Sequence, residues 1–335
     1  MIDYALIWAG LIAFAVLAYV VLDGFDLGVG ILFPFVKGKE NRDQMMNSVA
    51  PVWDGNETWL VLGGGGLFAV FPLAYAIIMP ALYIPIFIML LALVFRGVAF
   101  EFRWKEHAEN NLWDKAFAGG STVAAFAQGL TLGALVQGIA VDGRAYSGGA
   151  MDWLTPFSVL TGVALVVGYA LLGATWLVMK AEGEVYEKSL RYARITGVAT
   201  LALIGLVSLW TPFLHEHFAA KWFSWPDLIY VVPVPLLVLA CAWALYKGLE
   251  VGHSAKPYLA AVGLFILSYV GLVISFFPYI VPSSVTLWQA AAPDKSLHFL
   301  LVGAVVLIPI ILTYTAYAYW VFRGKVGNSS GYHSS

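Results

Sequence analysis

Residues 4–35 read YALIWAGLIAFAVLAYVVLDGFDLGVGILFPF, and this stretch decides the class of protein. No residue between Tyr4 and Leu22 is charged. The hydrocarbon core of a bilayer is about 30 Å thick, and a helix rises about 1.5 Å per residue, so roughly 20 apolar residues cross it. The run is too long for the apolar core of a signal peptide, and no positively charged region precedes it. We therefore expect a retained first transmembrane helix.

The rest of the chain repeats this composition. Of 335 residues, 61% are apolar and 11% are charged, against about 25% charged in a typical soluble domain. Apolar runs bounded by charges, Pro and Gly predict an all-α integral membrane protein of about nine transmembrane helices, arranged as two four-helix bundles plus one extra helix. Residues 1–326 would form a single transmembrane domain, and the Gly- and Ser-rich residues 327–335 a disordered cytoplasmic tail. The predicted helices are 4–35, 52–74, 79–103, 112–139, 156–180, 191–213, 226–247, 257–279 and 297–322.

The basic residues predict the orientation. Fourteen Lys and Arg side chains fall in the segments after odd-numbered helices, and three, Arg144, Lys221 and Lys295, fall in the opposite loops. Because Lys and Arg in short loops are retained on the cytoplasmic side, we expect an outside N-terminus and a cytoplasmic C-terminus. A net charge of −2 without a basic run excludes nucleic acid as a partner class. The single cysteine, Cys241, allows no internal disulfide.

Charged residues inside the spans need an explanation, because each costs about 2.5–3.5 kcal/mol on insertion scales. Asp23 and Asp26 share one side of the first helix. The small residues Gly24 and Gly28 are predicted to form a contact surface on which a neighbouring helix packs tightly.

Asp54 opens the second helix and Arg96 lies in the third, so these four charged groups are expected at similar depth. Arg96 either extends toward the membrane surface or neutralises one of the carboxylates. Asp54 either has a functional role or simply complements the dipole of the helix that it opens. The group is read either as a proton path or as a structural polar network.

The histidines argue against a haem bound by this chain. Axial ligands such as His project into a bundle core, whereas the six histidines fall in loops, at span ends or in the tail. His215-Glu216-His217 does not form a metal pair on a helix, because side chains two residues apart diverge. We expect no metal site and no haem. The histidines are His107, His215, His217, His253, His298 and His333.

Five stretches together resemble subunit II of cytochrome bd-type ubiquinol oxidases. They are DGFDLGVG (23–30), PVWDGNETW (51–59), FRG (95–97), PYIVPSS (278–284) and YTAYAYW (314–320). The resemblance implies a haem-free subunit of a bacterial inner-membrane terminal oxidase that oxidises quinol and reduces dioxygen to water. The N-terminus would then be periplasmic, and a partner, subunit I, would carry haem b, haem d and the quinol-oxidising loop.

The same resemblance assigns candidate residues. Asp54 carries over as part of a proton path at the subunit interface, and Asp23 and Asp26 join it with less defined roles. A supporting polar network is expected from Trp53, Asn56, Glu57, Arg96 and Glu101.

Other features of the family remain open. Some members hold a structural quinone in subunit II, and nothing in the sequence identifies that site here. Membrane lipid and the quinone pool are expected around the complex. Whether small accessory subunits bind is left open. The compact length resembles the cyanide-insensitive branch. Gln289 follows Trp288 where the family often has an acid, so a titrating role there is in doubt.

Two rival functions remain. An ion-coupled secondary transporter also interrupts helices with Asp and Gly, but it predicts paired broken helices in related halves, and only one such element is visible. A purely structural assembly subunit would contribute nothing to proton movement. Replacing Asp54 with Asn separates that alternative from a proton path.

Overall fold

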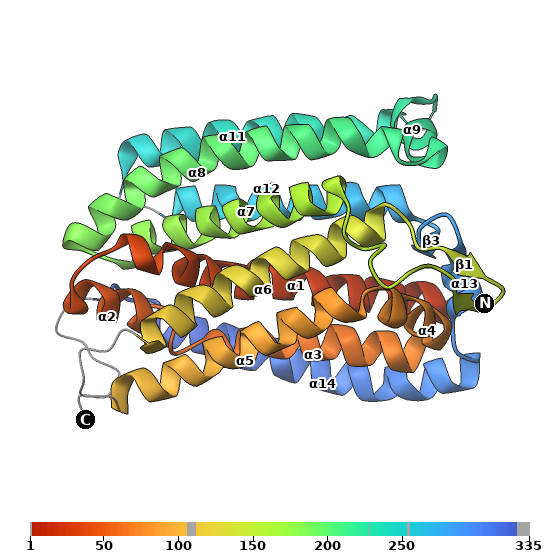
Figure 1. Cartoon of the computed structure of the whole chain (residues 1–335), viewed down its shortest axis with the longest axis horizontal. Helices are drawn as coiled ribbons and strands as arrows, with labels where there is room; N and C mark the ends of the chain where they lie inside the picture. The colour runs from red at the N-terminus through yellow and green to blue at the C-terminus, as the bar shows by residue number, and fades with distance from the viewer. Residues whose placement is uncertain (1, 106–111, 227, 253–254, 327–335) are drawn as a thin grey trace.

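A computed structural model describes residues 2–105, 112–226, 228–252 and 255–326. Long helices run side by side along the longest dimension of the molecule, in stacked layers (Figure 1). The segments that carry most of the basic residues, including α2 (Lys39–Asn47), gather at one end, here called the basic end. The N-terminus, α4 (Pro72–Ala81) and α9 (Glu216–Phe223) lie at the opposite end. Residues 327–335, predicted as a disordered tail, lie outside the described residues.

Two groups of four helices and a peripheral helix build the fold, as the sequence predicts. The first group lies beside the second through α1 and α6, which both pack on α7. The first group is α1 (Tyr4–Leu32), α3 (Trp53–Val70), α5 (Tyr83–Lys105) and α6 (Leu112–Val136). The second is α7 (Pro156–Lys180), α8 (Gly183–Trp210), α11 (Pro233–Val251) and α12 (Lys256–Phe276). The peripheral helix is α14 (Asp294–Val321).

Short elements close the end opposite the basic end. Two antiparallel hairpins lie there with α9 and three short helical turns. The hairpins are β1 (Val141–Asp142) with β2 (Ala145–Tyr146), and β3 (Tyr279–Val281) with β4 (Val285–Thr286). The helical turns are η2 (Thr211–Phe213), α10 (Leu228–Val231) and α13 (Leu287–Ala290), and a further turn, η1 (Phe33–Phe35), follows α1 at the basic end.

The structure corrects the boundaries of four predicted helices. Of the nine long helices in the described residues, eight are long and apolar enough to cross a membrane, and α3 is the exception. The predicted helix 52–74 is divided into α3 and α4 at Phe71, whose ψ of 62° is not helical. Pro72 starts α4 because a proline suits the first helical position, where no N–H is needed. The predicted helix 79–103 therefore begins at Tyr83. The helices predicted from 191 and 226 begin at Gly183 and Pro233 instead.

Glycines bring the two bundles into backbone contact. A Cβ on Gly28 would lie 1.8 Å from the Tyr169 carbonyl oxygen, and one on Gly173 would lie 2.3 Å from the Gly28 carbonyl carbon. A Cβ on Gly24 would lie 2.7 Å from the Tyr169 ring. The prediction that Gly24 and Gly28 form a contact surface is thus confirmed, and α7 is the helix that packs there.

The chain after α14 is fastened to the basic end. The Lys180 ammonium, 6% exposed, donates to the carbonyl oxygens of Phe322 at 2.5 Å and Gly324 at 3.1 Å. Gln44 donates to the Val326 carbonyl at 2.6 Å, and the Val326 N–H donates to the Lys180 carbonyl at 2.9 Å. At the opposite end, the Trp8 indole donates to the Leu297 carbonyl at 3.0 Å. These contacts hold a helix that is otherwise mostly exposed.

Substituting Gly28 tests the contact between the bundles. Gly28→Ala places a methyl group inside the backbone of α7, and overpacking costs about 1–3 kcal/mol or more. We expect a lower thermal unfolding midpoint of the detergent-purified protein and a lower yield. Gly10→Ala on the same helix is the matched control, because a Cβ there meets no atom within 4 Å. Equal midpoints for the two variants would contradict the close packing.

Removing the Lys180 ammonium tests the attachment of the C-terminal segment. Lys180→Met keeps the packing of the side chain on Trp176 but removes a charged donor from the carbonyl oxygens of Phe322 and Gly324, at about 1.5–3 kcal/mol. We expect faster hydrogen exchange of the Val326 amide, measured by mass spectrometry. Lys188→Met, which removes an exposed lysine paired with Glu184, should leave that amide unchanged.

Candidate functional site

Helix α1 carries two buried carboxylates. Asp23 and Asp26 are both 0% exposed. Their spacing of three residues puts them on neighbouring positions of one helix side, while Gly24 and Gly28 face α7. The polar pair therefore points into the first bundle, toward α3 and α5.

Arg96 of α5 meets both carboxylates. Its Nη1 lies 2.8 Å from Asp23 Oδ1, its Nη2 lies 3.7 Å from Asp26 Oδ2, and Nη1 lies 2.9 Å from Glu57 Oε1. The side chain is 0% exposed. Of the two alternatives for Arg96, the structure shows neutralisation of carboxylates rather than a side chain extended to the surface. We call Asp23, Asp26, Glu57 and Arg96 the ion cluster.

Aromatic rings cover one side of the ion cluster. Trp53 and Phe100 stack with ring centroids 4.7 Å apart. The Arg96 guanidinium carbon lies 5.7 Å from the Trp53 ring centre and 5.8 Å from that of Phe100, within the range of cation–π attraction. Gly120 of α6 permits this arrangement, because a Cβ there would lie 3.0 Å from the Arg96 nitrogen. The expected supporting role of Trp53 thus has a geometric basis.

Two amides border the ion cluster. Asn56 donates to Asp26 Oδ2 at 2.7 Å and accepts from the Tyr319 hydroxyl at 3.0 Å. On the other side, Gln128 donates to the Tyr19 hydroxyl at 2.6 Å and accepts from the Tyr169 hydroxyl at 2.8 Å. Tyr19 precedes Asp23 by one helical turn.

Asp54 and Glu101 stay outside the ion cluster. Asp54 is exposed, and its described hydrogen bond is made by its backbone carbonyl, which accepts from the Thr58 hydroxyl. The buried side of α3 contains Asn56, Trp59 and Gly63. At about 100° per residue, Asp54 lies roughly 160° around the helix from Asn56, so it points away from the bundle.

Glu101 is also exposed, about 140° around α5 from Arg96. The structure therefore brings together three of the four charged groups expected at one depth, adds Glu57, and leaves Asp54 on the surface.

The polar residues Tyr19, Gln128, Tyr169 and Tyr319 were not among the predicted site residues. Gln128 had a detectable signal, since an uncharged amide inside a transmembrane helix needs a partner. The tyrosines had none, because Tyr is common near membrane interfaces for other reasons.

The described histidines lie away from the ion cluster. His215 is the N-cap of α9, His217 stands against Tyr279, and His298 contacts the Tyr4 hydroxyl at 3.1 Å. All three are at the end opposite the basic end, and none projects into a bundle core. His107, His253 and His333 lie outside the described residues.

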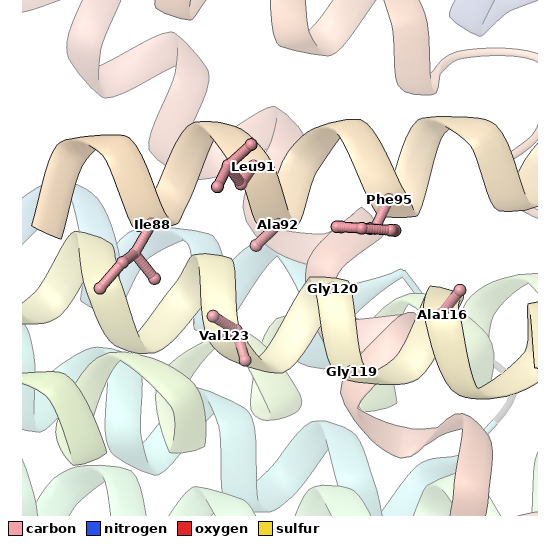
Figure 2. Close-up of a pocket in the computed structure, with 8 residues that line it drawn as sticks. All are labelled: Ile88, Leu91, Ala92, Phe95, Ala116, Gly119, Gly120 and Val123. Carbon is pink, nitrogen blue, oxygen red and sulfur yellow. The ribbon is translucent and has the colours of Figure 1, made fainter.

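An apolar hollow of about 300 Å³ opens between α5 and α6 (Figure 2). Its lining consists of aliphatic side chains, one aromatic ring and glycines: Ile88, Leu91, Ala92, Phe95, Ala116, Gly119, Gly120 and Val123. This lining fits a hydrocarbon chain and offers no side-chain hydrogen bond to a quinone head group. The structural quinone stays an open prediction.

Known proteins are similar to this chain in sequence and fold. The family model for cytochrome bd terminal oxidase subunit II matches residues 4–322. Cytochrome bd-I ubiquinol oxidase subunit 2 of Escherichia coli strain K12 is 31% identical, with 97% of each chain covered. Cytochrome bd ubiquinol oxidase subunit 2 of Bacillus subtilis is 29% identical, with 96% of each chain covered.

A solved structure has the same architecture. The bd oxidase from Geobacillus thermodenitrificans matches with a TM-score of 0.75 at 16% identity, over 96% of this chain and 99% of the solved chain. At this identity the match establishes the fold, and the family model and the relatives establish the membership. The chain belongs to the cytochrome bd terminal oxidase subunit II family and is a subunit of a quinol-oxidising oxidoreductase complex.

Proposed function

We propose that this chain is the haem-free subunit of its oxidase complex and that it carries protons from the cytoplasm toward the partner subunit I. Haem b and haem d belong to subunit I in this proposal. The chain's own contribution is the set of acidic residues at the basic end: Asp54, Asp23 and Asp26. Because the chain belongs to the oxidase subunit family, the hypothesis of an ion-coupled secondary transporter is set aside.

The charge of the ion cluster is the observation that carries the proposal. A structural ion pair needs one carboxylate per guanidinium, whereas Arg96 faces three carboxylates, from Asp23, Asp26 and Glu57. Uncompensated buried charge is expensive, so polar groups of this kind in a membrane mark ion or proton pathways. Excess carboxylates that bind and release protons account for the arrangement.

The position of the ion cluster supports entry from the cytoplasm. The segments at its end of the molecule hold fourteen of the eighteen Lys and Arg residues, which the positive-inside rule places in the cytoplasm. This orientation leaves the N-terminus in the periplasm. Asp54 opens α3 at the same end, where protons enter from water.

Asp54 also lies on a surface suited to the partner. The outer face of α3 exposes Val61 and Phe68, 74% and 61% exposed. On the adjoining helix α14, Tyr314 is exposed and lines a small hollow together with Gly55 of α3. We assign this face of α3 and α14 to subunit I. Asp54 would then pass protons along the boundary between the two subunits.

Purification of the intact complex tests the assignment of subunits. A tag on this chain should bring down a second multispan protein, and the reduced-minus-oxidised spectrum should show haem b and haem d bands. A colourless, stable and solitary protein would overturn the proposal.

Substituting Asp54 tests the proton path. Asp54→Asn keeps the shape of the side chain but removes its proton exchange, and loss of a proton-transfer group costs on the order of 10²-fold in rate. We expect that slowing of quinol oxidation and of proton uptake by the haem-loaded complex in vesicles. Glu187→Gln, at an exposed carboxylate on α8, is the control and should be neutral. Unchanged turnover of Asp54→Asn with full haem content would favour a purely structural subunit.

A further inference from the structure

The ion cluster is short of positive charge. With every group ionised, Asp23, Asp26 and Glu57 bring three negative charges and Arg96 brings one positive charge. Each uncompensated buried ion costs several kcal/mol, so bound protons lower the free energy of the cluster. Within the described residues, the exposed Asp54 neighbours Glu57. The other titratable groups around the cluster are phenols, which are neutral at neutral pH. These phenols belong to Tyr19 of α1, Tyr169 of α7, Tyr258 of α12 and Tyr319 of α14.

The ion cluster also holds polar atoms that lack a hydrogen-bond partner within the described chain. They include Asp26 Oδ1, an acceptor, and Arg96 Nε and Nη2, which are donors. Both side chains are 0% exposed. An unpaired buried polar atom costs about 1–3 kcal/mol, and native proteins satisfy such atoms with ordered water. A mixture of donors and acceptors fits water, whereas a metal cation would face the positive guanidinium.

We infer that the ion cluster binds internal water together with one exchangeable proton shared by Asp23 and Asp26, and that Glu57 is the carboxylate through which this proton enters and leaves. The inference rests on the proposed proton path and adds a binding site and a transfer residue to it. The proton moves from the Glu57 carboxylic acid to the bound water, and that water gives a proton to the Asp23–Asp26 pair. Glu57 is left as a carboxylate beside Arg96 and is protonated again from the Asp54 side.

Exposure selects Glu57 for this role. Its side chain is 25% exposed, whereas those of Asp23 and Arg96 are 0% exposed. Glu57 Oε1 and Asp23 Oδ1 contact the same Arg96 nitrogen, at 2.9 and 2.8 Å. Asp54 lies three residues before Glu57, close enough for the two side chains to be neighbours on the helix surface.

The side-chain amides of Asn56 and Gln128 block proton transfer on the other sides of the ion cluster. A side-chain amide neither ionises nor gives up a proton at neutral pH, although it donates and accepts hydrogen bonds. Asn56 stands between Asp26 and Tyr319, and Gln128 stands between Tyr19 and Tyr169. Within the described chain, a proton bound at Asp23 and Asp26 therefore has Glu57 as its titratable route to the surface.

Infrared difference spectroscopy of the purified complex tests the bound proton. The wild-type complex should show a carboxylic-acid C=O band that shifts in D₂O, and Asp26→Asn should abolish it. Asp54→Asn should retain the band, so a failure of the path at Asp54 is distinguishable from a failure of the proton site. A wild-type complex without any band that depends on Asp26 would overturn the inference.

The rate of hydrogen–deuterium exchange of that band tests Glu57. Glu57→Gln should keep the band and slow its exchange on the order of 10-fold or more, because a proton-transfer group is lost. Glu57→Asp should restore most of the exchange rate, and Glu187→Gln should leave it unchanged. Equal exchange rates in Glu57→Gln and wild type, at equal haem content, would contradict the role of Glu57. This comparison decides the question even where Asp26→Asn fails to assemble.

Discussion

The buried guanidinium of Arg96 is the constraint on which the rest of the first bundle depends. A buried charge without partners is strongly destabilising, so α1 and α3 must place their carboxylates against α5. That requirement fixes the rotation of all three helices. Gly120 then lets α6 approach the backbone of α5, and Gly28 lets α7 approach α1 from the opposite side. Electrostatic pairing with Arg96 thus determines which faces of α1, α3 and α5 point into the bundle. The glycines determine how closely α6 and α7 pack against them.

The ion cluster also reaches the periphery of the molecule. Tyr319 of α14 donates to Asn56, which in turn donates to Asp26. Trp176 of α7 packs near Tyr319, and the Lys180 ammonium stands over the Trp176 ring while it fastens the segment after α14. A shift of α14 when a partner binds would therefore change the hydrogen bond that orients Asp26. Side chains of α3 and α7 thus connect the exposed helix α14 to the buried ion cluster.

Hydropathy predicted the approximate positions of the long helices, about nine of them, and eight in the described residues are long and apolar enough to cross a membrane. The length of each apolar run is set by the thickness of the bilayer. Hydropathy could not place the break at Phe71, since both sides of the break are apolar, nor the polar start of α8, which extends to Gly183 through charged residues that favour water. The buried pair Asp23 and Asp26 was predictable from spacing alone. Whether Asp54 or Glu57 meets Arg96 was not, because the rotation of α3 is decided by the packing of Asn56 and Trp59 on α1.

The composition of the ion cluster argues that its role exceeds stability. Buried ion pairs are often replaced by apolar residues without loss of stability, so stability alone does not demand even one of them. Three carboxylates around a single guanidinium are less favourable still, and polar atoms left without partners add to the cost. Proteins accept such local costs at functional sites. A group of carboxylates that exchanges protons needs this imbalance, because a fully neutralised ion pair has no proton to accept or release.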